Sequence, residues 1–212
     1  MPLLSKITTK QLILRLESFK SGYIVDLSGL DMREADLRNE EVRSLLTTIT
    51  KDVAKSDSGY IDLSYSNISG RDFSKYDLSH VIMTKVIAEH TIFAETNLSD
   101  TQLDGAILNY ADFRGADLRY TKLYNATING INLSKANLVN AYGLYMGVPG
   151  KDTIKRLSVV SSIYGTIFPR NVEVMREEIQ KEMDRIKPKA PKKKHLSEKH
   201  LARQAANDES SW

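Results

Sequence analysis

Large apolar residues recur at nearly every fifth position through the middle of the chain, and fifteen of sixteen such positions fit the pattern. A second column, two residues earlier, holds mostly small or β-branched residues. The intervening positions are mostly Asp, Asn, Ser, Gly, Lys and Arg. The first column reads Leu63, Ile68, Phe73, Leu78, Met83, Ala88 (the exception), Phe93, Leu98, Leu103, Leu108, Phe113, Leu118, Leu123, Ile128, Leu133 and Leu138.

A period of five matches neither of the two regular secondary structures. An α-helix would spread these apolar residues around its whole surface, and one long strand would place alternate members on opposite faces. Within a single unit, however, Ala116 and Leu118 are two residues apart and share one face of a short extended segment. The remaining residues of the unit turn a corner. The pattern therefore predicts a solenoid with an apolar interior.

Spacings of twenty residues indicate how many units close one coil. Phe73, Phe93 and Phe113 are separated by twenty, which is four units. If four units form a coil, the three rings stack inside it. The same spacing then predicts an external ladder of Asp77, Asn97, Asp117 and Asn137.

The segment NLSDTQLDGAILNYADFRGADLRYTKLYNATINGINLSKANLVNA resembles the pentapeptide-repeat family, whose consensus is A-(D/N)-L-x-x. The match covers residues 61–142 and is strongest from Thr91 to Asn140. The resemblance implies a right-handed, four-sided β-helix. We therefore expect an all-β solenoid core with an inserted helix and terminal helices. The family is functionally diverse: some members imitate DNA and act on DNA gyrase, and others are bacterial effectors delivered into host cells.

Two residues depart from the repeat, because Arg71 and Tyr76 occupy the inward-pointing column. Arg71 would be a costly buried charge unless the early coil is distorted or open there. A partial first coil precedes the array, and its phase slips by one residue before Leu63. A helix inserted at residues 39–57 explains the slip, with Asn39 as N-cap. The partial coil and the helical stripe consist of Val25, Leu27, Leu30, Met32, Ala35 and Leu37, and of Val42, Leu45, Leu46, Ile49 and Val53.

The ends of the chain predict caps. Residues 8–19 read as a short helix over the open end, with a strand at LILRL as the alternative. Residues 158–168 read as a strand. A second amphipathic helix follows Pro169 and Asn171, and it either caps the solenoid or pairs with a second copy to make a homodimer. Its apolar stripe is Val172, Met175, Ile179, Met183 and Ile186.

The predicted domain organisation has four parts. An N-terminal capping segment covers 1–21, and the repeat β-helix covers 22–142 with its helical insertion at 39–57. A capping strand and helix region covers 143–186. Residues 187–212 are rich in lysine and proline and poor in apolar residues, so we expect a disordered basic tail.

Composition narrows the class of protein. The chain has 212 residues, 41% of them hydrophobic, with 30 Lys and Arg against 27 Asp and Glu. Cysteine is absent, which excludes disulfide scaffolds, thiol nucleophiles and Cys-ligated zinc. No signal peptide is evident, and no apolar run approaches the ~20 residues of a membrane span. We expect a cytoplasmic protein, or one secreted by a route without an N-terminal signal.

The sequence offers little chemistry. His80 and His90 are two units apart, so a four-sided coil places them on opposite sides, where they cannot share a metal. The many outward carboxylates are those that the repeat requires. The stretch GLYMGVPGKD lacks the spacing of a phosphate-binding loop and reads as a turn. We therefore expect no catalytic, cofactor or metal site, and no enzymatic activity.

Two surface features remain as candidate binding sites. Ile87 and Ile107 are twenty apart in an outward column, with Ile82 and Ile92 on neighbouring sides, so they either bind a protein partner or are covered by a helix or terminal segment. The second feature is the tail, whose charge would attract nucleic acid or an anionic membrane. Its candidate residues are Lys189, Lys192, Lys193 and Lys194.

Three function classes follow. The leading hypothesis is a non-enzymatic scaffold for protein–protein interaction, with delivery as a bacterial effector as one setting. The first alternative is a DNA-mimicking regulator of DNA gyrase or another topoisomerase. Duplex DNA carries one charge per ~1.7 Å, so a mimic four coils long would need about eleven net negative charges, whereas residues 61–142 carry nine acids and seven bases. The second alternative is a binder of nucleic acid or anionic membrane through the tail.

Overall fold

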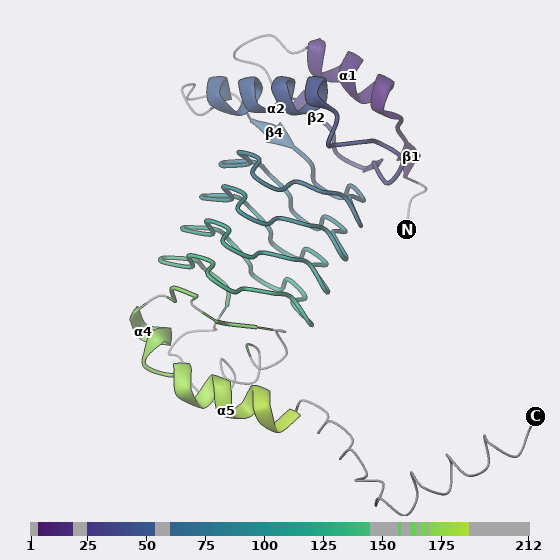
Figure 1. Ribbon diagram of the computed structural model, residues 1–212. Coiled ribbons are helices and arrows are strands. Elements are labelled where there is room, and N and C mark those ends of the chain that lie inside the picture. Colours follow the sequence, from purple (N-terminus) through teal and green to yellow (C-terminus); the bar gives the residue numbers. More distant parts are fainter. Residues whose placement is uncertain are drawn as a thin grey trace, which may run out of the picture.

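The structure is a computed structural model that describes residues 4–18, 25–53, 60–144, 157, 162–164, 166–168 and 170–186. Its middle is a stack of short coils, and helices lie at both ends of the stack (Figure 1). None of the helices in these ranges is long and apolar enough to span a membrane. The elements are β1 (Ser5–Lys6), α1 (Thr9–Glu17), β2 (Val25–Asp26), β3 (Leu30–Asp31), α2 (Glu40–Val53), β4 (Ile61–Asp62), α4 (Arg170–Glu173) and α5 (Arg176–Ile186).

Each coil has four sides, because a residue pairs in parallel with the residue twenty positions later. Asp62 pairs with Ile82 and Asn67 with Ile87, and the register continues through Lys122 and Tyr142. We number the sides by the outward residue at the centre of each pairing. Side 1 carries Asp62, Ile82, Gln102, Lys122 and Tyr142; side 2 carries Asn67, Ile87, Ile107 and Thr127; side 3 carries Asp72, Ile92, Asp112 and Asn132; side 4 carries Asp77, Asn97, Asp117 and Asn137.

The corners explain why the fifth position of each unit is so rarely β-branched. Every fifth residue from Tyr65 to Asn140 has a φ between 55° and 69°, the left-handed region. In each unit the chain closes a turn across this residue, as in the bond from the Arg71 amide to the Ile68 carbonyl at 3.1 Å. A positive φ at the third turn position is what a type II turn requires. Glycine or an unbranched side chain therefore occupies every corner.

Polar side chains complete the turns and the interior. Where an Asp or Asn precedes the large apolar residue, it accepts a hydrogen bond from the backbone two residues on, as Asp72 does from Ser74 at 2.9 Å. Buried threonines donate to a carbonyl of the preceding coil, as Thr96 does to Phe73 at 2.7 Å. These bonds satisfy groups that would otherwise be costly to bury. The repeat's small and polar positions are therefore structural.

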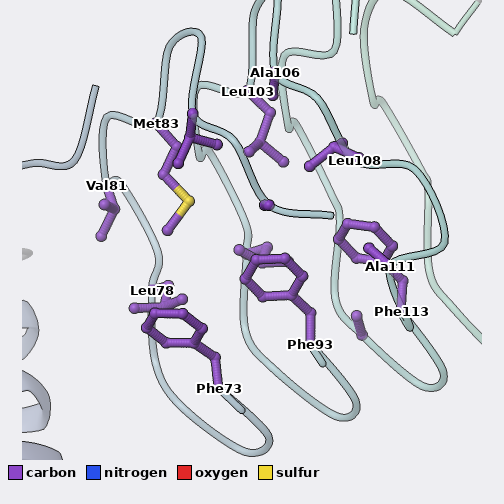
Figure 2. Packing of buried hydrophobic residues seen from close by; sticks show 14 of the residues in the cluster. Phe73, Leu78, Val81, Met83, Phe93, Leu103, Ala106, Leu108, Ala111 and Phe113 are labelled. Atoms are coloured by element: carbon purple, nitrogen blue, oxygen red, sulfur yellow. The ribbon is translucent and has the colours of Figure 1, made fainter. Parts of the chain in front are cut away.

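The core is a set of stacked columns (Figure 2). The rings of Phe73 and Phe93 stack with centroids 5.6 Å apart, and those of Phe93 and Phe113 stack at 5.1 Å. All three side chains are almost completely buried. The predicted interior stack is therefore confirmed. The predicted external ladder is also confirmed, because Asp77, Asn97, Asp117 and Asn137 pair in succession. Within this row the Asn97 side chain donates to Asp77 at 3.0 Å, whereas Asp117 pairs with Arg119 at 2.6 Å.

The N-terminal end is closed by two helices that lie side by side (Figure 1). Helix α1 begins with a capping box between Thr8 and Gln11, so the strand alternative for LILRL is wrong. Helix α2 follows Asn39, whose side chain caps it as expected. The insertion does not interrupt the ladder on sides 1 and 2, because Val25 pairs with Ile61 and Asp31 with Asn67.

The two departures from the repeat lie where the first coil leaves the array for α2. Tyr76 is buried, and its hydroxyl donates to the Leu37 carbonyl. Arg71 is only partly buried and donates through Nη1 to the Ala35 carbonyl at 3.1 Å, although its Nε is buried with no hydrogen-bond partner among the described residues. Long polar side chains thus reach carbonyls of a coil that does not continue, which is why the repeat is broken at these two positions.

At the C-terminal end, Ser162 and Ile167 extend sides 3 and 4 by one further row. The predicted single helix is two helices, α4 and α5, separated at Val174 and Met175. Arg176 donates to the carbonyls of Ile163 and Thr166, which have no further coil to pair with among the described residues. The apolar stripe is buried at Val172, Ile179 and Met183, with Ile186 exposed.

This burial bears on the homodimer predicted through the C-terminal helix. The stripe packs against the core of its own chain and serves as a cap. The buried part of the stripe is therefore occupied within its own chain, and a homodimer through this helix stays a prediction. Residues 145–156, 158–161 and the predicted tail from 187 lie outside the described residues.

Candidate interaction surface

The four sides of the array differ in charge. Between residues 61 and 140, side 1 has two acids and two bases, side 3 has three acids and four bases, and side 4 has three acids and one base. Side 2 comprises residues 66–70, 86–90, 106–110 and 126–130, and its only formally charged residue is Glu89. Depletion of charge and enrichment in aromatic residues distinguish the core of a protein interface from other surface. Side 2 is thus the candidate interaction surface.

An isoleucine pair forms the centre of side 2. The β-ladder places Ile87 directly beside Ile107, and Asn67 and Thr127 continue the row above and below. Both isoleucines are half-buried by neighbouring rows. The described helices lie at the two ends of the stack rather than along this row (Figure 1). The predicted alternative, in which a helix covers Ile87 and Ile107, does not hold for the described helices.

A hydrogen-bonded polar ladder runs beside the isoleucine row. Asn109 donates through Nδ2 to the Glu89 carboxylate at 3.1 Å, and Asn129 donates through Nδ2 to the Asn109 carbonyl oxygen at 3.1 Å. The Asn129 backbone amide donates to the same oxygen at 3.3 Å. Because these groups already satisfy one another, covering them costs less than covering free polar groups.

An aromatic stack forms the far edge of side 2. The rings of His90 and Tyr110 lie with centroids 5.0 Å apart and planes at 11°. Tyr110 is 61% exposed. On the next coil its ring lies over Gly130, where an added Cβ would be 2.6 Å from a ring carbon. An exposed tyrosine held in place by its neighbours is the kind of side chain that dominates protein interfaces.

The four predicted isoleucines do not form one patch. Ile82 lies on side 1 between Asp62 and Gln102, and Ile92 lies on side 3 between Asp72 and Asp112. Only Ile87 and Ile107 pair with each other. Ile92, at 36% exposed, is separated from them by a corner. We therefore restrict the predicted partner-binding surface to side 2.

Sequence reasoning missed the tyrosines. Tyr110 lies on side 2, and other exposed tyrosines occupy corners or outward positions elsewhere on the array. A signal for them was available, because the fifth residue of each unit turns the corner and must point outward. The exposed tyrosines are Tyr65, Tyr110, Tyr120, Tyr124, Tyr142 and Tyr164.

The shifted carboxyl pKa values have structural causes. The Arg33 side chain donates to Asp31 and holds the pKa of that buried carboxyl below its usual range. Burial would raise the pKa of Asp117, but hydrogen bonds from the Arg119 side chain and backbone lower it overall. Within the described parts of the chain, no three His, Asp or Glu side chains gather as a metal site would require. These groups stabilise turns.

The distribution of charge also bears on the DNA-mimic hypothesis. The most acidic side, side 4, carries Asp77, Asp100 and Asp117 against Arg119. Arg119 is bound to Asp117 at 2.6 Å. A surface that imitates duplex DNA over roughly 19 Å would need about eleven net negative charges. No side of the array approaches that number.

The repeat itself is recognised by comparison with known families. The model of pentapeptide repeats matches residues 96–134, with eight copies. The chain contains a pentapeptide-repeat domain. The family implies a right-handed, four-sided β-helix, and the pairing of each residue with the residue twenty positions later supplies the four sides in this chain.

Solved pentapeptide-repeat structures resemble parts of the chain. One, from the cyanobacterium Cyanothece, is 27% identical over 50% of this chain and 63% of its own, with a TM-score of 0.39. Another, from the thylakoid lumen of Arabidopsis thaliana, is 24% identical over 50% and 59%, with a TM-score of 0.35. The plasmid-mediated fluoroquinolone resistance protein QnrB1 is 11% identical over 89% and 100%, with a TM-score of 0.25.

The chain thus spans about six tenths of the length of the first two structures. No curated protein matches the chain. At these TM-scores the assignment of the domain rests on the repeat match and on the ladder register.

Proposed function

We propose that the chain is a non-enzymatic scaffold that binds a protein through side 2 of its pentapeptide-repeat domain. The observation that carries the proposal is the single charge on side 2, in a chain of which 27% is charged. Ile87, Ile107 and the stacked pair His90 and Tyr110 lie on this side. Their apolar surface is the part of an interface that contributes most to affinity.

The rigidity of the array supports the same proposal. Each side is held by parallel pairing to the coils above and below, and by turn hydrogen bonds at both corners. Side 2 therefore loses little conformational freedom when a partner covers it. Preorganisation of this kind lowers the entropic cost of binding.

The test is site-specific photo-crosslinking. A photoreactive amino acid replaces Ile107 in one variant and Ile92 in a matched control, because both are outward isoleucines at the same point of the ladder on different sides. We expect irradiation of cells that express the protein to give a defined covalent adduct at 107 and not at 92. Excess unlabelled protein should suppress the adduct. Equal adducts at both positions, or none at 107, would overturn the proposal.

A further inference from the structure

Side 2 is complementary to itself, and this property indicates which partner it binds. We infer that the partner is a second copy of this chain, docked face to face with its solenoid axis antiparallel. This inference rests on the proposed function, because it names the occupant of the same surface. It places the dimer on side 2 and not on the C-terminal helix, whose stripe is buried in its own chain.

The rows of side 2 are arranged so that one twofold axis relates them in pairs. A twofold axis that lies in the interface, perpendicular to the solenoid axis and midway between the rows of Ile87 and Ile107, exchanges those two rows. The same axis exchanges the outer rows, which are centred on Asn67 and Thr127. Evenly spaced coils on both copies keep all four rows in register.

This axis brings compatible groups together at each position. Ile87 of one copy faces Ile107 of the second copy, so apolar surface covers apolar surface. His90 faces Tyr110 of the second copy, so the stacked rings at the edge of one copy meet those of the other.

Charge favours a second copy on side 2 over side 3. Glu89, the one acid of side 2, faces Asn109 of the second copy, and an amide is able to donate a hydrogen bond to it. No carboxylate therefore faces another carboxylate. On side 3 the corresponding axis between the rows of Ile92 and Asp112 would place Asp72 opposite Asn132, with Arg114 and Lys75 also brought into the interface. Covering those charges would carry a desolvation cost that side 2 avoids.

The size of side 2 sets the expected strength. Four rows at ~4.8 Å cover roughly 19 Å of the axis. Even a strip ~20 Å wide would then bury only roughly 400 Å² on each copy, about half of what a stable interface buries. We therefore expect a weak, concentration-dependent dimer with a Kd of ~10 µM or above.

Sedimentation equilibrium of the full chain tests the inference. Over roughly 5 µM to 1 mM, a range set by that Kd, we expect the weight-average mass to rise from 23.9 kDa toward twice that value. Ile107→Glu brings a carboxylate into the apolar centre of both copies and should keep the chain monomeric. Ile92→Glu, the matched change on side 3, should associate as the unmodified chain does. Thermal unfolding of both variants checks that each is folded.

The register is tested separately by disulfide trapping, because the chain contains no cysteine. The single variants Ile87→Cys and Ile107→Cys are mixed and oxidised mildly. We expect the mixed disulfide between the two variants to exceed either homodisulfide. The corresponding side 1 variants, Ile82→Cys and Gln102→Cys, should give no more than the background of random collision.

The outcomes separate this inference from the proposed function. A chain that stays at monomer mass over the whole range, or no excess of mixed disulfide, overturns the second-copy inference. If a crosslinker at Ile107 then captures a protein other than this chain, the proposed function stands. If it captures nothing, both fail.

Discussion

The ring of Tyr110 lies over Gly130 on the next coil, so closely that a Cβ at position 130 would be 2.6 Å from it. Above Tyr110, the ring of His90 is stacked at 5.0 Å. Two structural features thus favour glycine at position 130: a left-handed φ of 67° and the contact with the Tyr110 ring. The edge of side 2 depends on this fit.

The first prediction separates those two reasons. Gly130→Ala should destabilise the protein by about 2–3 kcal/mol, because the left-handed backbone costs roughly 1–2 kcal/mol and the methyl group must displace the ring. Gly70→Ala has the same kind of φ, 69°, and no atom within 4 Å of the new Cβ, so it should cost only the backbone part. Urea unfolding of the two variants measures the difference. Equal losses would show that the ring contact contributes nothing.

The second prediction concerns the junction between the first coil and the array. Tyr76→Phe removes the hydroxyl that donates to the Leu37 carbonyl and leaves that carbonyl without this partner. We expect a loss of about 1–3 kcal/mol in the free energy of unfolding. Tyr65→Phe is the control, because Tyr65 is 54% exposed and should be near neutral. A Tyr76→Phe protein as stable as the control would mean that the bond is unimportant.

The third prediction concerns the C-terminal cap. Arg176 donates to the Ile163 and Thr166 carbonyls, pairs with Glu173 at 2.6 Å and lies over the Phe168 ring at 5.1 Å. Arg176→Ala should loosen α4 and α5 and speed amide hydrogen exchange there before it affects the central coils. Arg185→Ala, which removes only an exposed ion pair with Glu182, should leave exchange unchanged. Uniform acceleration along the array would contradict a local capping role.

The fourth prediction is a dependence of stability on pH. Arg33 donates to the buried Asp31 carboxylate at 2.9 and 2.7 Å and lowers its pKa. A carboxyl whose pKa is lower in the folded state stabilises fully above its ordinary pKa of about 3.9, and this contribution is lost as pH falls through the lower folded value. Asp31→Asn should therefore lower Tm near neutral pH and shrink the fall in Tm below about pH 4. An unchanged acid transition would rule out this pair as its source.

The fold was largely predictable because the same five-residue pattern recurs in many consecutive units. The interior stack of Phe73, Phe93 and Phe113 followed from spacing alone, and the structure confirms it. The helix at Glu40–Val53 begins where Asn39 indicated. These signals either recur along the chain or depend only on neighbouring residues, so a single sequence is sufficient to predict the structure from them.

Departures from the repeat were harder to predict. Arg71 and Tyr76 were visible as exceptions, but their partners, Ala35 and Leu37, lie in a different coil and depend on where the chain leaves for α2. The stripe of the C-terminal helix was compatible with capping or dimerisation, and only the structure shows that most of it packs on the core of its own chain.

The candidate site was half predicted. Ile87 and Ile107 were identified from the outward column, and the ladder brings them together. Ile82 and Ile92 are also outward isoleucines, but they lie on other sides, which carry more charged residues. Tyr110 and the absence of charge on side 2 emerge only when the sequence is divided by side, which requires the number of units per coil to be established first.

The most direct test of the account places a photoreactive amino acid on each side of one coil, at Gln102, Ile107, Asp112 and Asp117 in turn. These four positions are the outward residues of one coil, and each lies on a different side. We expect a strong adduct from position 107 and background from the other three. An adduct centred on 102, 112 or 117 would contradict the assignment of side 2 as the interaction surface.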